Sequence, residues 1–574
     1  MILVNGTRSA TLSTDRRVAL LPGVLLSLGV IAVLAATAAI EQSGDSLAYL
    51  TKARDGEGLF HPHHLIFNAA VRSVYLGLNS VTGIRDVVLA AQVHNLAFTF
   101  VALLAVYWIG LRWLSSQSLG LLGLALYGST TGILVFATQA EVYVPAVAAL
   151  GWATVFFLQL LDSPTSKKAA AGLLVAWVLA VFYHQTAVLF LIPMVVGVLV
   201  LRSRYLAAIL AVVSGLAGAV VLGAYWFAYR IEAASSSEPL TFLRFIFSYA
   251  VDGGARWGHA SNVGASGMAR LLESHLWGLT ALIPERPGVL IAVAVAGVAA
   301  VVAVGRFTDP RTRLLLSFAV SWTVAFLGFF LWWLPGEVEF AVLTSMPVCL
   351  AVVAGVSPAV LDSRFGATGA RIVIAAVVVV AAANFWWNLR LEVLPRHRSQ
   401  SEAFHQARFM SQFDGGSTLK LSRYDVATSI RFYFGAPADS VGRVNLLERA
   451  LYDGEMVSPS MTRNTWDRVI VSVHEIRPWA WHNGRNGFSE PETWLRLIYW
   501  IFNLRSDGEG WSTNVWEIVS DDRGNDYLLI WSDRAPVSDP SQLFLLLRDE
   551  LKSQSPERRA FSKWMKVNSG LLRR

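Results

Sequence analysis

Acidic and histidine side chains stand at the ends of several long apolar segments of this sequence. Asp45 follows the first segment, Glu141 begins the fourth, and His184 interrupts the run between the fifth and sixth. Glu337 and Glu339 begin the tenth. Ionisable residues that collect on one side of a membrane mark functional sites. A carboxylate in such a place can take the proton of an attacking hydroxyl, as a general base does.

Three histidines, His61, His63 and His64, lie in the loop after the first apolar segment. Imidazoles of this kind can bind a metal ion. Two of them are adjacent and Pro62 separates the third, and adjacent side chains on a helix point apart. The pattern therefore favours contact with a substrate, or a structural role, over a shared metal ion.

Each of these residues also has a plain structural interpretation. Asp45 is of the type that caps a helix, and a helix is expected from there towards Ala53. Glu141 can be an ordinary interfacial charge, and His184 a polar helix end. Glu337 and Glu339 can flank a loop without any function.

The composition defines the elements that must position these side chains. The chain is 54% hydrophobic and 15% charged, against roughly 25% charged in soluble proteins. About 20 apolar residues cross the hydrocarbon of a bilayer. We therefore predict about eleven spans: Val18–Ile40, Val87–Ile109, Leu119–Ala137, Val142–Leu160, Ala169–Phe182, Ala187–Leu201, Leu206–Tyr229, Val289–Val304, Leu314–Leu334, Phe340–Val356 and Ile372–Trp387.

Basic residues give the orientation, because Lys and Arg in short loops mark the cytoplasmic side. With the N-terminus inside, every second connection is basic, as at Arg112, Lys167, Lys168, Arg202 and Arg204. The short loops on the other side carry neither Lys nor Arg; they are Thr138–Glu141, Tyr183–Thr186 and Pro335–Glu339. This pattern places the acidic and histidine residues on the outer face.

Two outer loops are long, from Glu41 to about Asp86 and from about Arg230 to Pro287. Each contains apolar residues at helical spacing, from Ile66 to Val81 and from Leu272 to Ile283. We interpret both as helices that lie in the membrane interface. If Gly267–Ile283 crossed the membrane instead, every later orientation would invert.

The sequence divides near residue 394. Residues 1–394 form the predicted transmembrane domain, and residues 395–574 form a predicted extracytoplasmic soluble domain of α/β or α+β class. Its strand-like runs are Thr418–Leu421, Arg468–Val473 and Asp526–Trp531, and its helical runs are Ser541–Leu551 and Glu557–Met565. The single cysteine, Cys349, excludes intrachain disulfides, and the net charge of +7 is assigned to topology rather than to a nucleic-acid partner.

The outer loops resemble those of the GT-C superfamily of integral-membrane glycosyltransferases, which includes the protein O-mannosyltransferases. The resemblance rests on Gly44–Tyr49 (Gly-Asp-Ser-Leu-Ala-Tyr), Phe60–Leu65 (Phe-His-Pro-His-His-Leu) and Gln139–Tyr143 (Gln-Ala-Glu-Val-Tyr). In that superfamily an acidic residue of the first outer loop serves the reaction, and a second often lies in the next loop. Asp45 and Glu141 match these positions. Many members carry two acidic residues together in the first loop, whereas Ser46 follows Asp45 here.

The resemblance implies transfer of a sugar from a polyprenyl-phosphate carrier to an acceptor hydroxyl on a protein, a glycan or a lipid. Asp45 and Glu141 would be catalytic, and the departing phosphate would need cations such as Arg244, Arg256 and Arg286. The remaining candidates for substrate contact are His61, His63, His64, His184, Glu337 and Glu339. The sequence implies no firm cofactor and leaves a divalent cation open.

Two other classes of protein remain as alternatives. A transporter or flippase often shows internal repeats and charges near the bilayer midplane, neither of which is evident here. A mere anchor for the outer domain would not need the long polar first loop. The spans, rich in Ala, Val and Arg, suggest a bacterial inner membrane as the location, with membrane lipids as surroundings.

Overall fold

The computed structural model describes residues 15–235, 241–247, 258, 262–281, 310–397, 399–413, 418–422, 424–436, 441–443, 468–472 and 514–532. The chain divides into two compact units. The first, called the helical unit below, comprises Met1–Ile40 and Ala48–Gln400. The second, called the sheet unit, comprises Glu41–Leu47 and Ser401–Arg574. Each unit is described by itself.

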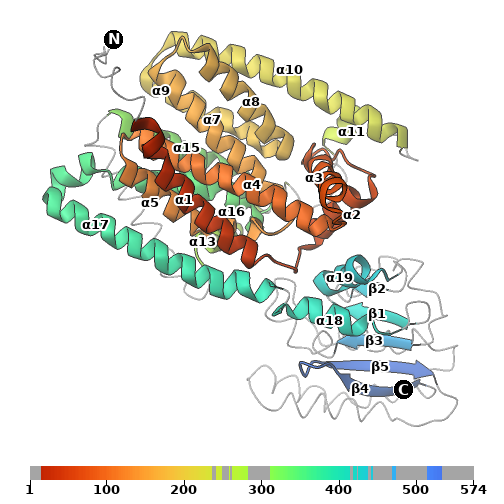
Figure 1. Cartoon of the computed structure of the whole chain (residues 1–574). Coiled ribbons are helices and arrows are strands. Elements are labelled where there is room, and N and C mark those ends of the chain that lie inside the picture. The colour runs from red at the N-terminus through yellow and green to blue at the C-terminus, as the bar shows by residue number, and fades with distance from the viewer. Residues whose placement is uncertain are drawn as a thin grey trace. The chain divides into compact units, whose positions relative to one another are not determined.

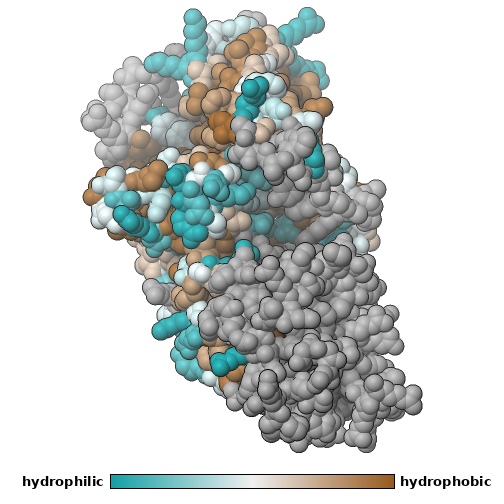
Figure 2. Space-filling model, turned by 90° about the vertical axis from the view of Figure 1, so that its right-hand side faces the viewer, coloured by the Kyte–Doolittle hydropathy of each residue, from teal (hydrophilic) through white to brown (hydrophobic). Residues whose placement is uncertain are grey.

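Seven helical stretches among the described residues are long and apolar enough to cross a membrane. They are formed by α1 (Asp15–Ala36), α4 (Val87–Trp108) with the π-helix η1 (Ile109–Trp113), α7 (Tyr143–Asp162), α10 (Arg204–Ser235), α15 (Pro310–Trp333), η5 (Val338–Phe340) with α16 (Ala341–Gly355), and α17 (Pro358–Asn388) with η6 (Leu389–Val393) and η7 (Leu394–Arg396). Figure 1 shows these helices packed together, and Figure 2 shows hydrophobic surface on this unit between gatherings of hydrophilic side chains. The helical, polytopic class predicted from the sequence is confirmed.

Two further predicted spans are shorter helices. Ala169–Phe182 lies within α8 (Lys167–Tyr183, 17 residues), and Ala187–Leu201 is divided between the 3-10 helix η2 (Gln185–Phe190) and α9 (Leu191–Leu201). Tyr183 ends α8 because the backbone at His184 is extended. The predicted span Val289–Val304 lies outside the described residues.

The predicted span Leu119–Ala137 is not one helix. It is divided into α5 (Gln117–Gly128) and α6 (Thr131–Phe136). At the break, the Ser129 carbonyl accepts hydrogen bonds from the side-chain amides of Asn384 at 3.0 Å and Asn388 at 2.8 Å. A helix can break at membrane depth only where protein groups satisfy the freed backbone, and these two asparagines of α17 do so.

Each long outer loop contains helices, as predicted. The first contains α2 (Gly44–Asp55) and α3 (Phe67–Thr82), and the second contains α11 (Phe242–Ile246) and α13 (Ala265–Leu279). α13 has 15 residues and is therefore about 22 Å long, short of the roughly 30 Å of a hydrocarbon core. This length favours the interfacial interpretation of α13, and the orientation of the chain stays a prediction.

A stripe of aromatic side chains on α15 forms part of the core of the helical unit. Phe318, Trp322, Phe326 and Phe330 follow one another at four-residue spacing along α15, and all are fully buried. Each contacts the next, with ring centroids 6.0–6.3 Å apart. The last of them, Phe330, stacks on Phe340 at 4.2 Å. The stripe thus fixes the loop that joins α15 to α16.

The sheet unit contains a five-stranded mixed sheet in the order β2-β1-β3-β5-β4. Its strands are β1 (Thr418–Ser422), β2 (Val441–Arg443), β3 (Arg468–Ser472), β4 (Asn514–Ser520) and β5 (Asp526–Ser532). β1 pairs in parallel with β2 and β3, whereas β5 is antiparallel to β3 and β4. Helices α18 (Glu402–Met410) and α19 (Tyr424–Phe434) share its core. The three strands predicted from sequence are confirmed; the predicted helices Ser541–Leu551 and Glu557–Met565 lie outside the described residues.

Asn388→Ala is expected to destabilise the helical unit. The side chain of Asn388 donates to the Ser129 carbonyl and accepts from the Ala281 amide, each at 2.8 Å. Its loss removes the acceptor of the Ala281 amide, whereas the Ser129 carbonyl keeps the donor of Asn384. The cost of the unsatisfied amide is about 1–3 kcal/mol. The thermal unfolding midpoint of the purified protein should fall by several degrees. Val380→Ala, a truncation to the same residue at an exposed position of the same helix, is the control and should barely move it.

Candidate functional site

Buried polar side chains of α4 hold together the connections that follow α1 and α6. The side-chain amide of Gln92 donates to the carbonyls of Ala39 at 2.7 Å and Thr138 at 3.1 Å. The side-chain amide of Asn95 donates to the carbonyls of Gln139 at 2.7 Å and Glu141 at 2.9 Å. Loop carbonyls that would otherwise be unsatisfied are thus paired with donors from a long apolar helix.

Glu141 lies at the end of this loop, immediately before α7, and its side chain is only 2% exposed. The Glu141 amide donates to the Gln139 carbonyl at 2.9 Å, which makes the loop tight. Two residues on, Tyr143 opens α7. A buried carboxylate costs free energy unless polar groups surround it, so its burial distinguishes Glu141 from an ordinary exposed interfacial charge.

His184 lies beside this loop. Its ring contacts Tyr143 with centroids 4.8 Å apart, and Tyr143 also contacts Phe340 at 5.7 Å. Nδ1 of His184 is 2.6 Å from the Thr186 hydroxyl, and the side chain caps η2. His184 is therefore both the polar helix end considered from the sequence and a neighbour of the Glu141 loop.

The three histidines of the first outer loop form a tight turn. The His64 amide donates to the His61 carbonyl at 3.1 Å, and the two rings stack with centroids 4.4 Å apart. The turn is anchored from two sides: the Tyr225 hydroxyl donates to the Pro62 carbonyl at 2.6 Å, and the Gln185 amide donates to the His63 carbonyl at 3.0 Å. The turn and the His184 connection are therefore neighbours.

Burial keeps these imidazoles neutral. It lowers the pKa of His61 to about 3 and that of His63 to about 4, and it lowers the pKa of His64 well below its usual value. The charge of Lys52 lowers the pKa of His61 and His64 further. For His184, burial and then the charge of His63 lower the pKa to about 3. At neutral pH these rings can donate and accept hydrogen bonds but do not supply positive charge to a phosphate.

Glu337 and Glu339 lie between α15 and α16 and are partly exposed. Their connection is held at both ends, because the Ser274 hydroxyl donates to the Pro335 carbonyl at 3.2 Å and Phe340 stacks on Phe330. Phe340 brings this loop to Tyr143 and hence to the Glu141 loop. Trp333, at the end of α15, has its ring centroid 6.3 Å from that of His63.

Asp45 lies in the first turn of α2, and its side chain is exposed. The cap of this helix is Ser43, whose hydroxyl accepts from the Ser46 amide at 3.0 Å. Capping alone therefore does not explain the carboxylate at position 45. Tyr49 follows one turn later on α2, and its ring lies edge-on to His64 at 4.4 Å.

Arg244 lies on α11 with an exposed side chain. Its neighbour Phe245 is buried in a cluster with Leu65, Tyr225 and Ala228, so α11 is anchored next to the histidine turn. The other two arginines predicted to meet a phosphate, Arg256 and Arg286, lie outside the described residues.

Among the residues that the structure describes, no group of three or more His, Cys, Asp or Glu side chains is arranged to hold a metal ion. In the histidine turn, the rings of His61 and His64 stack on each other, so their nitrogen atoms are not directed at a common point.

Sequence reasoning missed the residues that organise the site. Gln92 and Asn95 bind the Glu141 loop, and His94 joins them, with Nε2 2.9 Å from the Tyr183 hydroxyl. All three lie in a segment classed from sequence only as an apolar span. Three polar residues within four positions of such a span are themselves a signal of function, and this signal would have identified them.

Solved structures with similar folds support the resemblance noted in the sequence. ArnT from Cupriavidus metallidurans bound to undecaprenyl phosphate matches with a TM-score of 0.54 and 13% identity, over 91% of this chain and 98% of that one. The same protein in the apo state matches with a TM-score of 0.51 and 14% identity, over 88% of this chain and 97% of that one. The oligosaccharyltransferase of Archaeoglobus fulgidus matches with a TM-score of 0.47 and 11% identity, over 87% of this chain and 72% of that one. This similarity is too low to support a conclusion about the fold. No family model matches the chain, and no curated protein matches it in sequence.

The chain therefore shares the fold of ArnT. At these identities the likeness establishes the fold, and the activity has to be argued from the site.

Stability is predicted to fall as the pH is lowered from 7 to 5. The folded pKa of His184 is about 3, whereas an unfolded histidine titrates near 6.5, so the unfolded state binds more protons in this interval. One such histidine removes about 2 kcal/mol between these pH values. His184→Asn retains a polar atom at the Nδ1 position and should lose less stability on acidification. Thermal unfolding at both pH values checks this, with His397→Asn, at a partly exposed histidine, as the control.

Proposed function

We propose that this protein is a glycosyltransferase that moves a sugar from a polyprenyl-phosphate carrier to an acceptor hydroxyl. The single observation that carries the proposal is the gathering of the Glu141 loop, His184 and the histidine turn at one end of an apolar helical unit with the GT-C fold. A donor with an apolar tail and a polar head requires this combination. That the related fold of ArnT was solved with undecaprenyl phosphate supports a donor of this class.

The proposed reaction inverts the anomeric carbon. The carboxylate of Asp45 takes the proton of the acceptor hydroxyl while the hydroxyl oxygen bonds to that carbon. The bond from the carbon to the phosphate oxygen breaks, and the carrier phosphate leaves with the electron pair. Arg244, Arg256 and Arg286 are the proposed partners of the phosphate as its charge develops.

Glu141 is the proposed second carboxylate. Its burial suits a group that orients a substrate hydroxyl rather than one that exchanges protons with water. The neutral imidazoles of His61, His63, His64 and His184, together with Glu337 and Glu339, are proposed to bind sugar hydroxyls. Neutral rings suit this role because each can donate one hydrogen bond and accept another.

We place the reaction on the extracytoplasmic face of a bacterial inner membrane, with residues 395–574 as an extracytoplasmic domain. The alternation of basic and uncharged short loops supports this face. The acceptor is proposed to be a hydroxyl of a protein, a glycan or a lipid.

Asp45→Asn is expected to lower sugar transfer by about 10²-fold or more, the usual contribution of a general base, while the protein stays folded. Ser43 supplies the helix cap, so the amide should not disturb α2. Asp55→Asn, at the other end of the same helix and exposed, is the matched control and should stay within about twofold. Consumption of a purified polyprenyl-phosphate sugar is the measurement. Equal activity of the two variants would remove Asp45 from the mechanism.

Glu141→Gln should also reduce transfer, because the neutral amide keeps the size of the side chain but removes its charge. Its thermal midpoint, measured alongside, separates a lost substrate contact from a lost fold. A transporter or flippase would move the lipid-linked sugar across a vesicle membrane without consuming it, and that result would replace the proposed class.

The proposed orientation is tested with a reporter fused after Arg574. A fluorescent protein that matures only in the cytoplasm should stay dark, and an alkaline phosphatase that folds only outside should be active. The opposite pair of results would invert the orientation and move the site to the inner face.

A further inference from the structure

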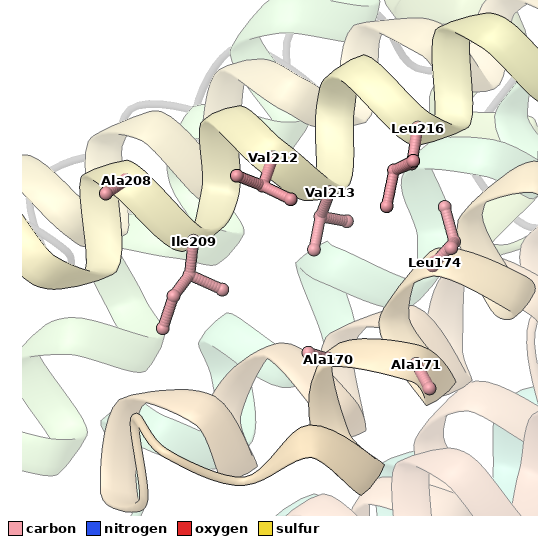
Figure 3. Close-up of a pocket in the computed structure, with 8 residues that line it drawn as sticks. All are labelled: Ala170, Ala171, Leu174, Ala208, Ile209, Val212, Val213 and Leu216. Carbon is pink, nitrogen blue, oxygen red and sulfur yellow. The ribbon is translucent and has the colours of Figure 1, made fainter.

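An apolar groove of about 440 Å³ lies between α8 and α10, away from the candidate site. Its lining comes from the two helices alone: Ala170, Ala171, Leu174, Ala208, Ile209, Val212, Val213 and Leu216. Figure 3 shows Ile209, Val213 and Leu216 pointing from α10 towards α8. The alanines of α8 leave the space that these branched side chains only partly fill.

The chemistry of the lining restricts the occupant. Val213 lies 4% exposed within the groove, whereas Val212 and Leu216 are 63% and 51% exposed, so the groove opens to the surroundings of the helical unit. Every lining side chain is a hydrocarbon, which offers no partner to a polar ligand. A flexible hydrocarbon chain can fill such a groove, since burial of apolar surface needs no directed contact.

Four cations lie at one end of this groove. Lys167 and Lys168 form the first turn of α8, directly before Ala170 and Ala171. Arg204 opens α10 one turn before Ala208, and Arg202 ends α9. All four side chains are exposed, and none of them makes an ion pair with a described carboxylate.

Three of these charges, those of Lys167, Lys168 and Arg204, do not stabilise their own helices. The N-terminal end of a helix carries partial positive charge, so cations in the first turn of α8 and at the start of α10 are unfavourable there. Positive charge therefore lies at the starts of α8 and α10, at one end of an apolar groove. This arrangement favours an anion that has a hydrocarbon tail.

We propose that this groove binds one acyl chain of an anionic phospholipid, whose phosphate lies among Lys167, Lys168, Arg202 and Arg204. The lipid belongs to the leaflet that faces the basic loops, which the charge pattern assigns to the cytoplasm. Because the groove is built on two helices, the bound lipid joins α8 to α10.

The lipid-linked sugar donor is a different ligand with a different place. α8 has its lysines at the first turn and His184 directly after its last residue, and its 17 residues span about 25 Å. A donor phosphate at the candidate site is therefore nearly a membrane thickness away from the four cations. The phospholipid proposal does not depend on the proposed enzymatic activity.

Native mass spectrometry of the purified full chain, titrated with phosphatidylglycerol or phosphatidylcholine, tests the proposal. Lys168→Gln combined with Arg204→Gln should weaken phosphatidylglycerol binding by about fivefold for each cation removed, the factor that corresponds to about 1 kcal/mol per cation at a membrane surface. Phosphatidylcholine binding should be unchanged. Arg313→Gln combined with Arg371→Gln, two exposed cations away from the groove, is the matched control and should bind as the unmodified protein does.

Ala170→Leu combined with Ala208→Leu fills the groove without altering charge and should abolish the preferential binding. Ala211→Leu combined with Ala219→Leu, at exposed positions of α10 outside the lining, should leave it intact. Equal phosphatidylglycerol binding in the groove and control variants would overturn the proposal. So would full displacement of phosphatidylglycerol by undecaprenyl phosphate, because the groove would then belong to the carrier lipid.

Discussion

The satisfaction of backbone polar groups away from water constrains the whole helical unit. Long apolar helices satisfy their own backbone, but their connections and breaks do not. Side chains of the spanning helices supply the missing donors, Gln92 and Asn95 at the Glu141 loop, and Asn384 and Asn388 at the break after α5. The few polar residues within the apolar segments therefore position the connections between the helices and the break after α5.

This constraint accounts for the character of the candidate site. A tight, buried loop presents Glu141 without solvent around it, and the histidine turn lies beside it with neutral rings. Positive charge is supplied from the margin instead, by Arg244 on α11 and by Lys52, which is near enough to lower the pKa of His61. The described part of this region thus combines buried, neutral polar groups with cationic side chains around them.

The apolar segments and their shared polar face could be predicted because each has a local physical cause. About 20 apolar residues suffice for a span, and the charge of a short loop reports its side. The break at Ser129 could not be predicted, because its partners Asn384 and Asn388 lie some 255 residues away in the sequence. The role of Asn95 could not be predicted for the same reason. An asparagine in an apolar segment indicates a polar contact, but it does not indicate which loop the side chain binds. β2 was missed because it has only three residues, and β4 because Asn514, Glu517 and Ser520 weaken its apolar pattern.

The polar residues of α17 and of η6, which continues it, have a consequence for how the helical unit can move. Asn384, Asn388 and Glu392 recur every four residues and bind Ser129, Leu279, Ala281 and Trp277, which lie at the break after α5 and at the end of α13. A slide of α17 by one residue would turn all three side chains away by about 100°. The contact between α17 and α13 thus has a single register, and the two helices can only shift together as one rigid body. Larger displacements within the helical unit have to arise in other parts of the bundle.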